Sequence, residues 1–544
     1  MIAVPDLLYP EPQRRLDARA LRDGLTFAFA TGGTGETFAK IWERASFGAS
    51  DFSEAHFARE LFLGDFVARC LSPTVNGRKY QPERGHLVSL IAHPPRDLAV
   101  THFRQAILRE LAAREGALEE LGRLTARLRQ LVTKLEAPDR GKRYDAIGRR
   151  IDILRTVREL VDQLAEAFPG AVSGLSRISA FAQAQRESEG YATLVNLLEH
   201  ENNRATVELR VKVGYDGDLR SFEIIRTEES QENPFYRSFF GRFLTKFTLW
   251  LKGFGFRESE LVGRLANAAF DQVQDSVMDL FQLLVDLEFY LASLSLQKLA
   301  AGSGLPMCLP ELKAQTEGAT ELSGLFNPFL LLEEHAPKTA ELSAAGNALV
   351  IITGPNSGGK TRLLQALGLV QLLGQCGSFV PARRASLSAR HGLFVSLTHE
   401  ASSDQREGRL GTELLRIRRM FEQLSCDSLV ILDELCSGTN PSEGEEIFEL
   451  VVSLLAELEP QAFITTHFLQ FASRLAAEPP IPHLAFLQVE LDEKETPTYG
   501  FVPGVATTSL AERTAERLGV TRDSLRELVD RAKSRAKGQS RGKD

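Results

Sequence analysis

The residues with the clearest chemical potential lie in one glycine-rich segment in the C-terminal half of the chain. Its sequence, GPNSGGKT, fits the spacing G-x-x-x-x-G-K-[ST] of a phosphate-binding loop. Glycines let the backbone turn tightly, so that successive N–H groups point at phosphate oxygens, and a following helix adds the positive end of its dipole. The predicted nucleotide-binding residues are Gly354, Pro355, Asn356, Ser357, Gly358, Gly359, Lys360 and Thr361.

Two side chains of this segment have a more specific use. The Lys360 ammonium is a point charge for the β- and γ-phosphates of a nucleotide, and the Thr361 hydroxyl is a ligand for Mg²⁺. Residues 348–352 form an apolar run typical of a strand, and leucines at helical spacing follow the loop. A glycine-rich turn without a ligand is the alternative, and these strand and helix flanks favour the phosphate-binding interpretation.

A pair of carboxylates follows a second apolar run, residues 429–432. Asp433, at the end of the predicted strand, would hold Mg²⁺, usually through water. Glu434, one residue further on, would reach the attacking water and act as a general base. The alternative is two acids at the start of the next helix, but beside a phosphate-binding loop the catalytic interpretation is favoured.

His467 ends a third such segment, because it follows Ile464, Thr465 and Thr466. At the end of a strand beside the loop, its ring could donate a hydrogen bond to the γ-phosphate and report hydrolysis. The alternative is a structural histidine at a strand end.

Composition excludes several classes of protein. With 544 residues the chain should form more than one domain, and its net charge of −8 argues against a surface that is basic throughout. The five cysteines contain no C-x-x-C pair, so neither a disulfide framework nor a zinc site is indicated. The N-terminal residues lack the pattern of a signal peptide, and no apolar run approaches the about 18 residues of a membrane span. We therefore expect a cytoplasmic protein.

Helical patterns dominate the first half of the chain. Residues 55–70 are amphipathic at helical spacing and predict one helix. Residues 121–135 and 147–164 each carry a narrow apolar seam with charges outside it, and turn residues at 137–141 separate them. Two long helices joined by a short turn suggest an antiparallel arm, and the alternative is a pair of ordinary bundle helices.

The only clear β pattern in the first half covers residues 206–226. Val207, Leu209, Val211 and Val213 alternate with charged residues before a turn, which predicts a hairpin. Further along the chain, residues 259–300 are amphipathic over their whole length and predict one long helix.

Residues 235–256 combine aromatic and basic side chains in an unusual density. Three interpretations remain open. The segment could be an interface or core helix whose basic residues extend to solvent, a helix on a membrane surface, or a set of stacking faces and phosphate contacts for nucleic acid. Aromatic stripes most often serve packing, so the first is favoured.

From about residue 321 onward the pattern becomes α/β. Apolar runs at 349–352, 393–397, 429–432 and 462–464 predict strands, and helical patterns lie between them. This alternation is what a parallel sheet requires.

The order of these motifs resembles that of the MutS family of ATPases. Its members carry, in this order, segments similar to GPNSGGKT (354–361), GSFVPA (377–382), LDELCSGTNPSEG (432–444), TTH (465–467) and PGVA (503–506). A segment similar to Asn327-Pro328-Phe329 lies upstream in the family as well. The resemblance is specific over residues 326–520 and weaker before them.

This resemblance implies a dimer in which each composite ATP site borrows residues from the partner. It implies roles in cis for Asn356, Lys360, Thr361, Asp433, Glu434 and His467. Residues 438–440 would lie near the dimer contact, and residues 408–413 occupy the place of the family's trans signature. There the sequence departs from the pattern, because the usual serine is not evident and Glu413 stands where an aromatic residue is expected.

The fold that the resemblance implies is multidomain: a mostly α-helical core, lever and clamp region, followed by an α/β P-loop ATPase domain of the ABC type. The expected regions are a first part of the helical core (1–100), a long-helix lever or arm (101–200), a reduced clamp with the hairpin and the basic-aromatic segment (201–257), a second part of the helical core (258–320), a MutS-like ATPase domain (321–520) and a helical, basic tail (521–544). We expect neither an N-terminal mismatch-reading domain nor a C-terminal nuclease domain.

The expected function is that of an ATP-dependent DNA-binding protein of the MutS family. ATP and Mg²⁺ would be its cofactors, and hydrolysis to ADP and phosphate would gate a dimeric clamp on DNA in mismatch repair or recombination. An alternative is an ATP-driven scaffold that acts on a membrane, RNA or the ribosome through residues 235–256 without mismatch recognition.

Overall fold

The computed structural model describes residues 4–75, 77–138, 143–201, 205–213, 219–229, 258–314, 318–333, 337–397, 408–436, 440–477, 481–507, 522 and 524–529. The chain forms two compact units. The helical unit comprises Met1–Ser50, Gly64–Lys298 and Cys376–Ser378, and the sheet unit comprises Asp51–Leu63, Leu299–Gln375 and Phe379–Asp544. The basic-aromatic residues 235–256 lie outside the described residues, as does most of the tail.

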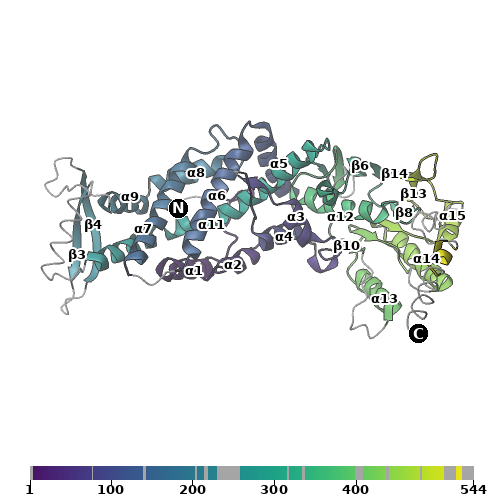
Figure 1. The fold of residues 1–544 in the computed structure, drawn as a ribbon, viewed down its shortest axis with the longest axis horizontal. Coiled ribbons are helices and arrows are strands. Elements are labelled where there is room, and N and C mark those ends of the chain that lie inside the picture. Colours follow the sequence, from purple (N-terminus) through teal and green to yellow (C-terminus); the bar gives the residue numbers. More distant parts are fainter. Residues whose placement is uncertain are drawn as a thin grey trace, which may run out of the picture. The chain divides into compact units, whose positions relative to one another are not determined.

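The helical unit contains most of the helices of the first half (Figure 1). They are α1 (Ala18–Thr31), α2 (Ala39–Glu43), α3 (Leu63–Cys70), α4 (Arg84–Ala92), α5 (Leu98–Ala113), α6 (Ala117–Glu136), α7 (Arg143–Ala165), α8 (Ser176–Arg186), α9 (Glu189–Glu201) and α11 (Glu258–Gly302). Two short strands, β1 (Thr74–Val75) and β2 (Arg78–Lys79), also pair in this unit.

The two predicted seams form α6 and α7, and their apolar residues are buried except for the half-buried Ile147. Polar contacts join α7 to three further helices. Arg149 Nη1 donates to the Phe29 carbonyl of α1 at 3.0 Å, while the Asp162 carboxylate of α7 accepts from Tyr191 of α9 at 2.7 Å and from Arg186 of α8 at 2.9 Å. These helices therefore pack in a bundle, as the alternative of ordinary bundle helices expects, and the lever or arm role of residues 101–200 stays a prediction.

The predicted long helix is confirmed as α11, which has 45 residues. Its middle part is buried on all sides, and three acids on it are buried with the apolar residues. Each acid pairs with an arginine from another segment: Asp279 with Arg14, Asp286 with Arg15 and Glu288 with Arg129. Burial raises the pKa of Asp286 to about 6, and the neighbouring Arg15 acts in the opposite direction.

The predicted hairpin is also confirmed. Strands β3 (Ala205–Val213) and β4 (Leu219–Glu229) pair in antiparallel register, and Figure 1 shows them next to α9. In the described part of the chain no helix is both long enough and apolar enough to span a membrane.

The sheet unit is built on six strands in the order β10-β11-β12-β8-β13-β14. Their bounds are β8 (Leu349–Thr353), β10 (Leu393–Ser396), β11 (Leu429–Leu432), β12 (Gln461–Thr465), β13 (Leu484–Leu491) and β14 (Pro497–Pro503). The first five run parallel and β14 is antiparallel. The four strands predicted from apolar runs and their parallel arrangement are confirmed, whereas β13 and β14 were not predicted.

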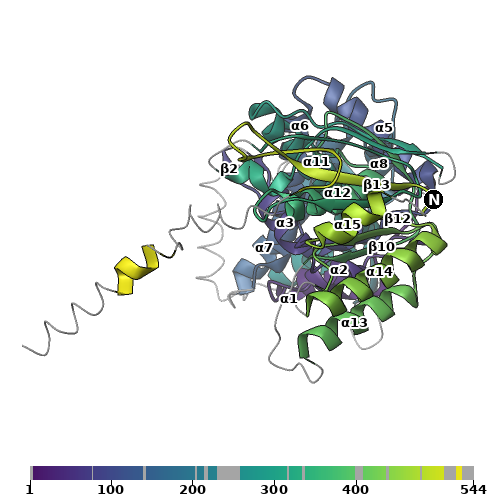
Figure 2. The same cartoon turned by 90° about the vertical axis from the view of Figure 1, so that its right-hand side faces the viewer.

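Helices cover both faces of this sheet because its central strands are buried on both sides. One face packs on α13 (Gly408–Phe421), α14 (Pro441–Leu458) and α15 (Leu469–Ala477), and Figure 2 shows α13 and α14 together on one side. The other face packs on α12 (Lys360–Cys376), where Gly368 lies close to Ile431 of β11. A second sheet, β5-β9-β6-β7, also belongs to this unit. Its elements are β5 (Glu311–Lys313), β6 (Thr320–Leu325), β7 (Ala340–Ala344) and β9 (Arg384–Ser388), with the 3-10 helix η2 (Pro328–Leu332) following β6.

The single helix predicted for residues 55–70 is wrong in its first half. A 3-10 turn, η1 (Glu54–His56), is followed by irregular turns, and α3 begins only at Leu63. The side chains of this segment pack in the sheet unit, where His56 stacks on Phe394 of β10 at 4.7 Å and Leu61 approaches Gly368 of α12. Burial of these side chains outweighs the local helical periodicity.

The chain is therefore a multidomain protein of mixed helices and sheets. The parallel register places the ends of β8, β11 and β12 at the same edge of the six-stranded sheet, because Leu432 pairs with Ile464 and Ile464 with Ile351. The loop after β8 and the polar residues after β11 and β12 consequently lie together.

Candidate functional site

The glycine-rich loop connects the end of β8 to the start of α12 and has the tight backbone that its sequence predicts. Gly354 has φ +137° and Gly359 has φ +91°, both outside the range that other residues favour. A Cβ on Gly354 would lie 2.7 Å from a methyl carbon of Val489 in β13, and one on Gly358 would lie 2.9 Å from it. Close packing against β13 therefore requires glycine at these positions.

Lys360 turns back onto this loop. Its ammonium donates to the carbonyls of Gly354 at 3.0 Å and Pro355 at 3.2 Å, and the residue is only 4% exposed. Burial lowers the pKa of Lys360, while the nearby carboxylates of Glu434 and Asp433 act in the opposite direction. A buried cation at a glycine-rich loop is suited to a polyanionic ligand.

The Asp433 carboxylate accepts hydroxyl hydrogen bonds from two sides. Thr361 Oγ1 of α12 lies 2.5 Å from Asp433 Oδ2, and Thr465 Oγ1 of β12 lies 2.5 Å from Asp433 Oδ1. Three segments thus bring oxygen atoms to one point at the edge of the sheet. Thr361 and Asp433 are brought together as the sequence predicts, whereas the bridging role of Thr465 was not predicted, because nothing in its local spacing indicates it.

Glu434 and His467 are in direct contact: His467 Nε2 lies 2.7 Å from Glu434 Oε1. The Glu434 backbone has φ +50°, and its N–H donates to Thr465 Oγ1 at 2.8 Å. Glu434 also lines the cavity described next. The structure thus places the predicted histidine against the predicted general base.

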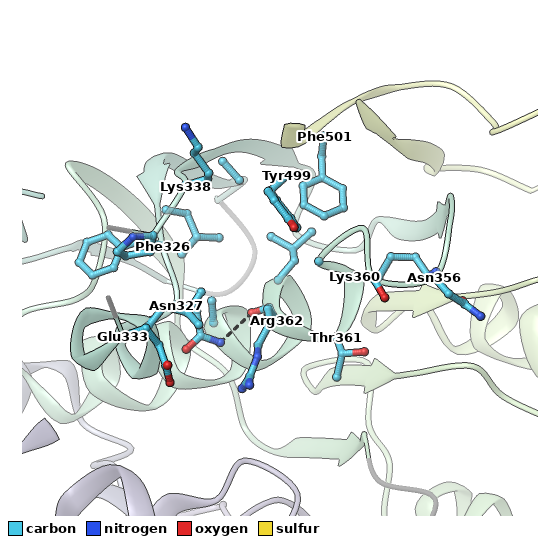
Figure 3. A pocket seen from close by; sticks show the side chains of 18 of the residues that line it. Phe326, Asn327, Glu333, Lys338, Asn356, Lys360, Thr361, Arg362, Tyr499 and Phe501 are labelled. Carbon is cyan, nitrogen blue, oxygen red and sulfur yellow. Dashed lines mark hydrogen bonds between the residues drawn. The ribbon is translucent and has the colours of Figure 1, made fainter. Parts of the chain in front are cut away.

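A cavity of about 830 Å³ begins at the glycine-rich loop and continues toward η2 and β14 (Figure 3). At one end it is lined by residues of the loop and by Thr361 and Glu434. The rest of the lining includes apolar and aromatic side chains, among them Phe326, Leu330, Pro337, Tyr499 and Phe501, and the charged side chains of Glu333 and Lys338. Tyr499 lies next to Gly359 of the loop. The loop half therefore suits phosphates, and the aromatic side chains suit a flat apolar group.

The apolar half was missed by sequence reasoning, except for the segment around Asn327. Tyr499 and Phe501 come from β14, which was not predicted, and no local motif marks them. Asn327 fixes η2 to α12, because its side chain donates to the Arg362 carbonyl at 3.0 Å and to Gln365 Oε1 at 2.9 Å (Figure 3).

Of the residues expected near a dimer contact, 438 and 439 lie outside the described residues and Asn440 precedes the first turn of α14. In the segment expected to act in trans, the Glu413 carboxylate accepts the Cys436 N–H at 2.6 Å. The departure from the family pattern at Glu413 thus creates a contact within this chain.

The comparisons with known proteins agree with this arrangement. Residues 350–537 match the model of the family described as MutS domain V. Endonuclease MutS2 of Thermomicrobium roseum is 31% identical over 279 residues, which are 49% of this chain and 34% of that protein. Endonuclease MutS2 of Thermus thermophilus is 34% identical over 180 residues, 33% of this chain and 24% of that protein.

The matched region thus spans about a quarter to a third of the length of these relatives. It coincides with most of the sheet unit, which holds the loop, the paired hydroxyls and acids and the cavity. On the strength of this match and of these relatives, the region of residues 350–537 belongs to the MutS family.

Proposed function

We propose that the chain binds ATP with Mg²⁺ in the cavity of the sheet unit, hydrolyses it, and uses this cycle to control its attachment to DNA. The observation that carries the proposal is the meeting of Thr361, Asp433, Glu434 and His467 beside the glycine-rich loop, at the edge where three parallel strands end.

The two halves of the cavity support ATP as the ligand. The loop and Lys360 offer backbone N–H groups and a buried cation to the phosphates. The half lined by Phe326, Tyr499 and Phe501 offers apolar surface and aromatic faces to a base. A volume of about 830 Å³ lies in the range of pockets for ligands of this size.

The chemistry of the oxygen atoms at the loop fits Mg²⁺. This ion prefers hard oxygen ligands and binds proteins through one or two carboxylates or hydroxyls, together with water and phosphate. Thr361 and Asp433 already lie at 2.5 Å from each other, so both oxygen atoms can face one ion. Thr361 and Asp433 would hold it, and the ion would offset phosphate charge.

Hydrolysis requires a group that orients the attacking water and takes its proton. We assign this role to Glu434, which lines the cavity. His467 holds Glu434 through the 2.7 Å contact and is placed to follow the state of the phosphates. These assignments support the proposal of a P-loop ATPase of the ABC type.

We further infer that two copies form composite ATP sites and that ATP gates a clamp on DNA. Membership of the MutS family and the MutS2 relatives support this inference. The described β3–β4 hairpin, next to α9, is a candidate for the clamp. No specific observation favours the membrane, RNA or ribosome scaffold, so it is kept as an outcome of the test below.

Two variants test the ATPase. Glu434→Gln keeps the shape of the site but cannot take a proton, so nucleotide binding should persist while hydrolysis slows roughly 10²- to 10⁴-fold. Lys360→Ala removes the buried cation and should weaken nucleotide binding itself. Hydrolysis at the wild-type rate by Glu434→Gln would remove Glu434 from the mechanism.

The DNA arm of the test uses the same preparations. Steady-state ATPase activity of the wild type is measured with and without linear duplex, branched DNA and single-stranded RNA of equal length, and with and without anionic vesicles. Stimulation by DNA supports the clamp. Stimulation by RNA alone, or by anionic vesicles alone, would transfer the proposal to the scaffold class.

A further inference from the structure

The loop that follows β11 has an unusual backbone. Glu434 has φ +50° and Cys436 has φ +59°, so two residues out of three adopt the left-handed conformation although neither is glycine. Such conformations persist only where surrounding contacts hold them. Here the Glu434 N–H donates to the Thr465 hydroxyl, and the Cys436 N–H donates to the carboxylate of Glu413 at 2.6 Å.

Glu413 comes from α13, and the rest of that helix explains why its carboxylate lies at this loop. Ile417 and Met420 follow Glu413 at intervals of four and three residues, so these three lie on one stripe of the helix, and Leu424 comes just after the helix ends. Met420 is buried in the core beneath the sheet, and Ile417 and Leu424 pack against that core. These apolar contacts therefore fix the position of α13 against the core. Glu413 lies on the same side of the helix, so its carboxylate reaches the loop that follows β11.

A carboxylate is a stronger acceptor for a backbone N–H than a neutral oxygen atom. Because the bond is made to Cys436, it constrains the backbone two residues after Glu434 and at the second of the two left-handed positions. An aromatic residue at position 413, which the family pattern predicts, could not accept this bond. Glu413, the residue that departs from the family pattern, thus accepts a hydrogen bond that helps to hold the strained loop.

We propose that Glu413 is a positioning residue for ATP hydrolysis: it holds the β11 loop so that the Glu434 carboxylate stays at the cavity and against His467. This inference rests on the proposed function, because it assigns Glu413 a part in hydrolysis at that site. Glu413 touches neither the cavity nor the Lys360 loop in the described structure, so it should affect the chemical step and not nucleotide binding.

The test compares three variants of the full chain in single-turnover hydrolysis with Mg·ATP, with affinity measured by titration of a non-hydrolysable ATP analogue. Glu413→Ala removes the acceptor, and Glu413→Gln keeps a neutral one. Glu422→Ala is the matched control, because Glu422 follows the end of α13, is exposed, and pairs with Arg418 at 3.0 Å on the surface. Glu413→Met, which fills the space without an acceptor of comparable strength, replaces Glu413→Ala if the alanine variant is unstable.

We expect Glu413→Ala to slow the single-turnover rate at least about tenfold, equivalent to about 1.4 kcal/mol in the barrier. Its affinity for the analogue should stay within about twofold of the wild type, Glu413→Gln should recover most of the rate, and Glu422→Ala should match the wild type. An unchanged rate in Glu413→Ala overturns the inference, and so does a Glu413→Gln rate as low as that of alanine or a parallel loss of analogue affinity.

Different results would contradict the proposed ATPase function itself. If the wild type does not hydrolyse ATP, or hydrolyses it at the same rate after Lys360→Ala, the ATPase assignment itself is wrong. If Lys360→Ala abolishes hydrolysis while Glu413→Ala leaves it unchanged, only the positioning role is lost.

Discussion

The substitution Thr465→Val removes one hydroxyl that joins the Asp433 carboxylate to the backbone of Glu434. That hydroxyl donates to Asp433 Oδ1 at 2.5 Å and accepts the Glu434 N–H at 2.8 Å, and Thr465 is fully buried. Valine has nearly the same shape, so the packing of β12 is kept while both hydrogen bonds are lost. The experiment therefore measures the two bonds and little else.

The expected loss of stability follows from these two bonds. A hydrogen bond to a charged group contributes roughly 1.5–3 kcal/mol and a neutral one roughly 0.5–1.5 kcal/mol, so the free energy of unfolding should fall by about 2–4.5 kcal/mol. Urea unfolding measures this free energy. The transition to use is the one whose midpoint moves to higher urea concentration when a non-hydrolysable ATP analogue is added, because a ligand that binds the native state stabilises the unit that binds it. Hydrolysis should slow as well, because Asp433 and Glu434 lose their shared support.

Thr320→Val is the matched control. Thr320 is also buried in the sheet unit, but its hydroxyl donates to the neutral Gln461 Oε1 at 3.0 Å and touches no acid. The same substitution there should cost only about 1 kcal/mol and leave ATP hydrolysis unchanged. If Thr465→Val destabilises no more than Thr320→Val, the reasoning from the bridging hydroxyl is refuted.

Three further expectations concern assembly, nucleic acid and the thiols. ATP should shift the protein toward a dimer, and Glu434→Gln should trap that dimer; sedimentation that shows a monomer with ATP bound, beside normal hydrolysis, contradicts the composite site. DNA affinity should fall steeply with salt and be nearly blind to one mismatch, because phosphate contacts dominate such binding; a mismatch preference above about tenfold, roughly 1.4 kcal/mol, in paired titrations argues against this. A thiol reagent at pH 8 should modify Cys426 first, since it is exposed whereas Cys70 and Cys436 are buried and burial raises the pKa of each to about 12; a fast phase that survives Cys426→Ser contradicts this reading.

The sequence alone was sufficient wherever the physical cause is local. Continuous apolar runs predict strands that are buried on both faces, and glycine spacing predicts the loop, because each depends only on neighbouring residues. Asp433, Glu434 and His467 could be placed at strand ends for the same reason. The long helix α11 follows from its unbroken periodicity, although its buried acids are explained only by their arginine partners from other segments.

Tertiary structure decided everything that depends on distant residues meeting. The contacts of Thr465 with Asp433 and of Glu413 with Cys436 join residues 32 and 23 positions apart, and no local spacing encodes them. Tyr499 reaches the cavity only because β14 adds to the sheet beside β13. Likewise the helix predicted at residues 55–70 gives way to turns, because burying its side chains against the sheet unit is worth more than continuing a helix.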